Sequence, residues 1–152
     1  MNTAFSDSLA QLFSKNLQQL SEEISQYEGK PLEFWAVRGM ISNSAGHLTQ
    51  HILGNLNHFI GHVLAKTDYV RDRKAEFSTH DISIATFKEQ IEAVDALIQD
   101  TFSKMTEEEW AQTYPLEVFK KPMTTAYFMQ HLLAHLSYHM GQINYHRRLI
   151  QL

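Results

Sequence analysis

The chain has 152 residues, of which 43% are hydrophobic and 20% charged, and its formal net charge at pH 7 is −4. This length predicts a single domain that spans residues 1–152 and is large enough to fold without a metal ion. The negative charge argues against nucleic-acid binding, and the absence of cysteine excludes disulfides and a thiol nucleophile. Because no signal peptide or long apolar run is visible, we expect a cytoplasmic protein without membrane contact.

The first half of the chain predicts two helices joined by an apolar connector. Residues 3–27 carry large apolar side chains at spacings of three and four, which is typical of a helix with one buried face. Gly29 and Pro31 are expected to end this helix. In the connector that follows, Trp35 is expected to cover one end of the molecule. A second helix is expected over residues 43–66, because Asn-Ser at its start can cap it.

The second half predicts two more helices and two crossings between helices. Residues 67–80 have no periodicity and are expected to form a long loop, and a third helix should follow over 81–105. The sequence Thr-Glu-Glu-Glu at 106–109 has the spacing of a capping box and predicts one short turn. The segment 112–123 contains two prolines and should cross to a fourth helix over 124–150. We therefore predict an all-α four-helix bundle with long crossover loops.

Eight of the nine histidines lie on two of these predicted helices. The second helix carries His47, His51, His58 and His62, and the fourth carries His131, His135, His139 and His146. At about 100° per residue, each set lies along one edge of its helix, beside the apolar face. Four pairs have i,i+4 spacing, at which two imidazoles rise from adjacent turns and can chelate one ion.

The surrounding sequence limits which metal centre these histidines can form. Residues 43–66 and 124–152 contain no Asp or Glu, which excludes a di-iron carboxylate centre. An all-imidazole site suits Zn, Ni, Cu or Fe and disfavours Mg and Ca. The pair His135 and His139 has the spacing seen in zinc proteases but lacks their neighbouring glutamate, so a protease would have no general base. Periodicity alone does not choose among the histidines.

Four stretches of the chain resemble the DinB-like family, which belongs to a broader group of four-helix bundles. That group includes bacillithiol transferases and mycothiol-dependent maleylpyruvate isomerases. The stretches are Asn43-Ser44, His51-Ile-Leu-Gly54-Asn55-Leu56, Arg71-Asp72-Arg73 with Glu76-Phe77, and His135-x-x-x-His139-x-Gly141-Gln142. The resemblance covers nearly the whole chain. It implies one divalent metal ion, most often Zn or Ni, held by His51, His135 and His139.

Several other residues are candidates for supporting roles. Asn55, Gln142 and His131 lie on the histidine edges and are expected to line a pocket or to form satisfied polar contacts. Arg73 and Glu76 are candidates for the rim of the pocket, but an ion pair between them that pins the 67–80 loop is the favoured interpretation. The short basic clusters at 71–74 and 147–148 are expected to be solvated surface charge. Of the remaining histidines, we expect His47 and His58 to support the ligands or the core.

The resemblance implies a metal-dependent enzyme, with a low-molecular-weight thiol transferred to a small electrophile and with the protein acting as a homodimer. Because the chain has no cysteine, the thiol would come from a cofactor. The same site could instead activate water for hydrolysis. No side chain stands out as a general base, although Tyr138 and His131 are close in sequence. The alternative is a non-catalytic bundle, with or without metal, that works through dimerisation or a protein partner; a haem or copper carrier is a weaker third hypothesis.

Overall fold

The computed structural model describes residues 3–150. Its helical segments are α1 (Ala4–Ser25), α2 (Pro31–Phe34), α3 (Ala45–Leu56), the π-helix η1 (Asn57–His62), α4 (Arg73–Glu76), α5 (Ile84–Lys104), α6 (Glu107–Ala111) and α7 (Thr125–Ile150). Within these residues there is no strand, only an isolated bridge between Thr113 and Thr124. The prediction of an all-α fold is confirmed.

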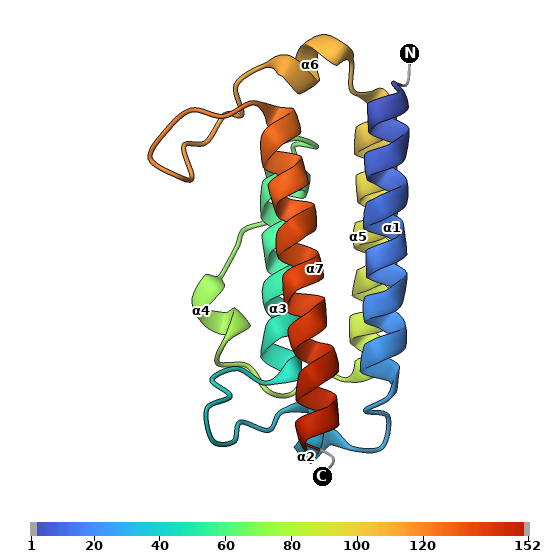
Figure 1. The fold of residues 1–152 in the computed structure, drawn as a ribbon, viewed down its shortest axis with the longest axis vertical. Helices are drawn as coiled ribbons and strands as arrows, with labels where there is room; N and C mark the ends of the chain where they lie inside the picture. The colour runs from blue at the N-terminus through green and yellow to red at the C-terminus, as the bar shows by residue number, and fades with distance from the viewer. Residues whose placement is uncertain (1–2, 151–152) are drawn as a thin grey trace.

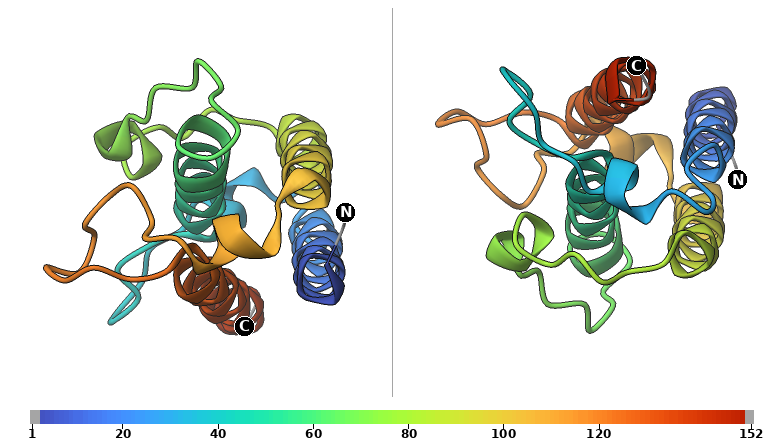
Figure 2. Two further views of the ribbon diagram at one scale, coloured as in Figure 1. Left: turned by 90° about the horizontal axis from the view of Figure 1, so that it is seen from above. Right: turned by 90° about the horizontal axis from the view of Figure 1, so that it is seen from below.

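The long helices α1, α3, α5 and α7 lie side by side along the long axis of the molecule (Figure 1). Helices α1 and α7 run in one direction and α3 and α5 in the other, and the end-on views show the four at the corners of the bundle (Figure 2). Helix α1 packs against α5 and α7, and α3 packs against α7 and α5. Residues 67–80, which we call the strap, contain α4 and run along the outside of α3.

The helices begin where side chains satisfy their first backbone N–H groups. Ser44 Oγ accepts a hydrogen bond of 3.1 Å from the backbone N–H of His47 at the start of α3, and Ser83 caps α5 in the same way. Thr106 and Glu109 form the predicted capping box at α6. Local sequence therefore determines where these helices start.

A continuous apolar core fills the space between the long helices. Its fully buried large side chains are Phe13, Leu17, Leu20, Ile24, Tyr27, Phe34, Ile52, Leu56, Ile60, Phe87, Phe102 and Phe128. Trp35 packs edge-on against Phe34, with ring centroids 5.2 Å apart, and also contacts Phe87. The core positions α3 and α7 next to each other, which brings their histidine edges together.

Two local features differ from the sequence-based expectation. Pro31 does not simply follow the first helix; it begins the short helix α2, because proline is well suited to a first helical turn. The second helix does not remain α-helical to residue 66, since it changes into the π-helix η1 at Asn57. None of the helices within residues 3–150 is both long enough and apolar enough to span a membrane.

Candidate metal centre

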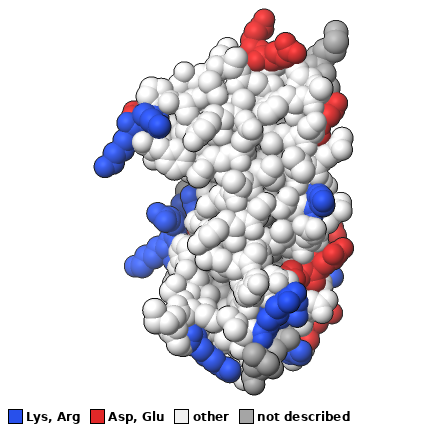
Figure 3. Space-filling model, in the orientation of Figure 1, with Lys and Arg blue, Asp and Glu red and all other residues white. Residues whose placement is uncertain are grey.

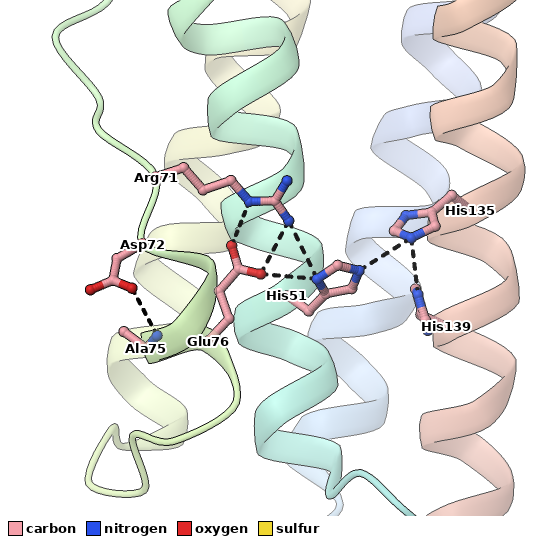
Figure 4. A network of polar contacts seen from close by, with 7 residues as sticks. All are labelled: His51, Arg71, Asp72, Ala75, Glu76, His135 and His139. Carbon is pink, nitrogen blue, oxygen red and sulfur yellow. Dashed lines mark hydrogen bonds and ion pairs between the residues drawn. The ribbon is translucent and has the colours of Figure 1, made fainter. Parts of the chain in front are cut away.

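Helices α3 and α7 bring three histidine side chains to one point (Figure 4). Nε2 of His51 lies 3.2 Å from Nε2 of His135, and Nε2 of His139 lies 3.0 Å from that same atom. His51 is buried, whereas His135 and His139 are half-buried. The structure thus assembles the three residues that the family resemblance selected, and together they could hold a metal ion.

Neighbouring oxygen atoms determine which nitrogens of two imidazoles carry hydrogen. Nδ1 of His51 lies 2.9 Å from a carboxylate oxygen of Glu76, and Nδ1 of His139 lies 2.6 Å from the amide oxygen of Gln142. Because these oxygens accept hydrogen bonds, both Nδ1 atoms act as donors, and each Nε2 presents a lone pair. Two lone pairs therefore face Nε2 of His135.

This arrangement fits a cation better than a hydrogen-bonded cluster. Nε2 of His135 can donate at most one hydrogen, so a neutral cluster leaves one of the two close nitrogen pairs without a hydrogen between them. Nitrogen ligands of a tetrahedral zinc ion, with bonds of about 2.0–2.1 Å, lie roughly 3.3 Å apart. The observed separations of 3.0 and 3.2 Å are close to that value. The donor atoms therefore fit a divalent transition metal.

The environment also favours the neutral imidazoles that a metal requires. Burial, together with the charges of His139 and His51, lowers the pKa of His135 to about 4. Burial lowers the pKa of His139 as well, although its hydrogen bond to Gln142 acts in the opposite direction. Both residues are therefore neutral near pH 7, when they can bind a cation without first losing a proton.

The strap places a buried ion pair against the far side of His51. Glu76 is 5% exposed and accepts hydrogen bonds from Arg71, of 2.7 Å from Nε and 3.1 Å from a terminal nitrogen. Burial alone would raise the pKa of Glu76, but the hydrogen bonds from His51 and Arg71 outweigh it and the pKa is lowered. Glu76 is therefore a carboxylate.

The expected ion pair between Arg73 and Glu76 is wrong, because the partner of Glu76 is Arg71. The side chain of Arg71 is 14% exposed, so it is not the solvated surface charge that the basic cluster suggested. Arg73 lies at the start of α4, where it is exposed. In the second basic cluster, Arg147 forms an ion pair with Glu23 across to α1.

The three predicted pocket residues have different surroundings. Gln142 contacts the cluster directly through His139. Asn55 is buried, and its amide oxygen has no hydrogen-bond partner within residues 3–150. His131 packs edge-on against Phe119, with centroids 4.7 Å apart, and its ring centroid lies 6.4 Å from that of His135. His131 therefore borders the cluster without joining it.

The other histidines of the two helix edges lie outside the cluster: His47, His58, His62 and His146. His146 accepts a hydrogen bond of 2.7 Å from the hydroxyl of Tyr27 and donates one of 2.8 Å to the carbonyl of Ala36. His47 packs edge-on against the ring of His80. His146 therefore holds the connector after α1 against α7, and its role is structural.

One cleft lies next to the cluster through Gln142, the hydrogen-bond partner of His139. It has a volume of about 260 Å³, and its lining includes Gln142, Ile41, Leu48 and Tyr145. A larger cavity of about 500 Å³ lies near α6, but its lining contains no histidine. Within residues 3–150, potential metal-ligand atoms converge only at the histidine cluster.

An all-α bundle with three converging imidazoles, reached from solvent on one side, defines a candidate mononuclear metal protein. The family model of the DinB superfamily matches residues 7–143, so the chain belongs to the DinB superfamily. Comparisons with curated proteins and with solved structures gave no match. The matched segment includes the three clustered histidines and the strap, and it confirms the family predicted from the sequence.

Proposed function

We propose that this protein is a metal-dependent enzyme that transfers a low-molecular-weight thiol to a small electrophile. His51, His135 and His139 would hold one divalent ion. Imidazole ligands suit Zn, Ni, Cu or Fe, and the family resemblance favours Zn or Ni among them. The observation that carries this proposal is the convergence of three imidazole nitrogens with no carboxylate among them.

A divalent ion with only neutral ligands keeps its full charge and lowers the pKa of a bound thiol or water. The carboxylate of Glu76 does not cancel that charge, because Arg71 is paired with it. The chain has no cysteine, so the thiol must be a separate small molecule. The cleft lined by Leu48 and Tyr145 supports binding of an apolar acceptor beside the site.

The proposal is tested first by the metal content of the purified protein. We expect about one Zn or Ni per chain by elemental analysis, and we expect the His139→Ala variant to lose it because one of three ligands is gone. His131→Ala is the matched control, since His131 lies one turn before His135 and outside the cluster. Full occupancy in His139→Ala would overturn the ligand assignment.

The second part of the test is the reaction. The metal-loaded protein is mixed with a small thiol and monobromobimane, and the fluorescent thioether is followed over time. We expect a rate above the uncatalysed background for the native protein, and only the background rate for His139→Ala. Metal-loaded protein that accelerates ester hydrolysis but not thioether formation would favour the hydrolase over the transferase.

A non-catalytic role through self-association is the second candidate, and the surface of α7 favours it. Residues 122–146 contain no Asp, Glu, Lys or Arg, and the face of α7 forms a largely uncharged band (Figure 3). Tyr127, Tyr138 and Tyr145 are exposed on this helix. We propose that this face contacts a second copy of the chain. Sedimentation equilibrium of the protein and of Tyr138→Lys tests this, and a monomeric protein would exclude it.

A further inference from the structure

We infer that Glu76 is the positioning residue for His51. We also infer that the strap, which carries Glu76, becomes more ordered when the metal binds. The inference rests on the proposed metal site and adds a residue outside the three ligands. It comes from the contact between Nδ1 of His51 and Glu76, which lies on the side of the imidazole away from the cluster (Figure 4).

The contact determines which ring nitrogen of His51 carries the hydrogen. A buried carboxylate can only accept, so it holds the hydrogen on Nδ1 and leaves Nε2 free to bind a cation. The negative charge also makes the imidazole a stronger electron donor. Loss of such a partner typically weakens metal binding by about 10–100-fold.

Helix α3 provides the space for this carboxylate by means of a glycine. A Cβ atom at Gly54 would lie 2.1 Å from Oε1 of Glu76, which is far closer than van der Waals contact. Any other residue at this position would push the carboxylate away from the helix. Gly54 therefore permits the approach that lets Glu76 reach His51.

Arg71 fixes the carboxylate, and one of its terminal nitrogens also lies 3.4 Å from Nδ1 of His51. Its guanidinium donates to both oxygens of Glu76, and it comes from the same strap (Figure 4). A buried carboxylate without a cation would be protonated or displaced into solvent. Arg71 thus keeps Glu76 charged while Glu76 acts on His51.

Elsewhere the strap borders a cavity of about 460 Å³, which is lined by Tyr69, Val70 and Asp72 of the strap and by residues of α3 and α5. Near its two ends the strap is held by polar and ring contacts: Nδ1 of His62 lies 2.9 Å from the carbonyl oxygen of Thr67, Gln50 donates a hydrogen bond of 2.8 Å to the carbonyl of Thr79, and the ring of His80 packs against that of His47. Between these ends, Glu76 and the ring of Phe77 both lie against His51. Because His51 joins the strap to the cluster, strap order and metal affinity must favour each other reciprocally.

The test compares Glu76→Gln with Asp72→Ala. Asp72 caps α4 by accepting a hydrogen bond of 3.0 Å from the N–H of Ala75 and does not touch His51, so its loss removes one hydrogen bond within the strap and leaves the contact between Glu76 and His51 in place. Zinc affinity is measured by competition with a chromophoric chelator. Hydrogen exchange of residues 67–80 is measured with and without zinc.

We expect zinc to slow exchange in the strap of the native protein, and Glu76→Gln to lose about 10–100-fold in zinc affinity. Asp72→Ala should lose much less.

A measurement without metal separates this inference from the proposed function. In zinc-free protein, ¹⁵N NMR of the imidazole should show His51 with hydrogen on Nδ1. Glu76→Gln should shift it toward the Nε2–H form, because Arg71 takes the amide oxygen and the amide NH2 group then faces Nδ1. If Glu76→Gln does not fold, Gly54→Ala displaces the same carboxylate and should give the same tautomer shift. Unchanged tautomer and zinc affinity would overturn the role of Glu76 and leave the metal site standing. Native protein that binds no zinc would overturn the metal site itself.

Discussion

His135 is the residue on which the cluster depends most, because its Nε2 faces both other imidazoles. Its low pKa is a property of the fold, since burial and the neighbouring histidines all oppose a positive charge there. A histidine kept neutral in this way can bind a cation but is costly to protonate. The proposed metal binding and the expected acid sensitivity would therefore have the same origin.

Acid should destabilise the metal-free protein within the range where histidine normally titrates. The pKa of His135 is about 4 in the folded chain, whereas an unfolded histidine titrates near about 6.5. The unfolded state binds more protons between these values, so stability is complete above about pH 6.5 and falls as the pH falls toward 4. We expect the melting temperature to drop between about pH 7 and pH 5. The drop should be smaller in His135→Gln, which cannot take up the proton; equal drops in both proteins would refute this explanation.

At the scale of single helices, replacing glycine by alanine should change the free energy of unfolding in opposite directions at two positions. Gly141 lies exposed in α7, and a Cβ there would meet no atom within 4 Å. Gly141→Ala should therefore raise the free energy of unfolding by about 0.5–1 kcal/mol, because alanine loses less backbone entropy in a helix. Gly54→Ala also increases the helix propensity of α3, but it forces Glu76 out of place. It should therefore lower the free energy of unfolding. Urea unfolding of the metal-free variants measures both, and stabilisation by both substitutions would contradict the contact at Gly54.

The helices themselves were largely predictable, because their signals are local. Ser44 and Thr106 cap α3 and α6 through residues only three positions away, and apolar spacing marks the buried faces. The histidines at i,i+4 spacing likewise indicated which two helices carry the cluster, because this spacing is also a local signal. The choice of His51 over its neighbours came from family resemblance, since periodicity places His47 and His58 on the same edge.

The remaining features arise from contacts between distant segments. Glu76 approaches His51 from 25 positions along the chain, and nothing in the irregular strap sequence indicates which of its charges turns inward. Arg71 and Arg73 are equivalent by composition, and only the path of the strap distinguishes them. The π-helix at the end of α3 likewise has no periodic signal. Gly54 was the one available clue, since a glycine inside a helix signals a close neighbour.

At the scale of the whole molecule, the candidate metal centre and the apolar core are separate. The core extends through all four long helices and includes buried side chains of α1 and α5, neither of which contributes a ligand. The cluster joins only α3 and α7, which already pack against each other. A metal ion bound at the cluster would therefore add stability to a fold that we expect the apolar core to maintain alone.

Removing the metal should consequently leave a folded protein. After treatment with a chelator, we expect the far-ultraviolet circular dichroism to remain helical and thermal unfolding to remain cooperative. Readdition of zinc at about one hundred times its dissociation constant should stabilise the protein by about 2.7 kcal/mol, because zinc binds the folded state alone. His139→Ala is the control, and its melting temperature should not respond to zinc. A chelated protein that lost its helical signal would show that the metal, rather than the core, holds α3 and α7 together.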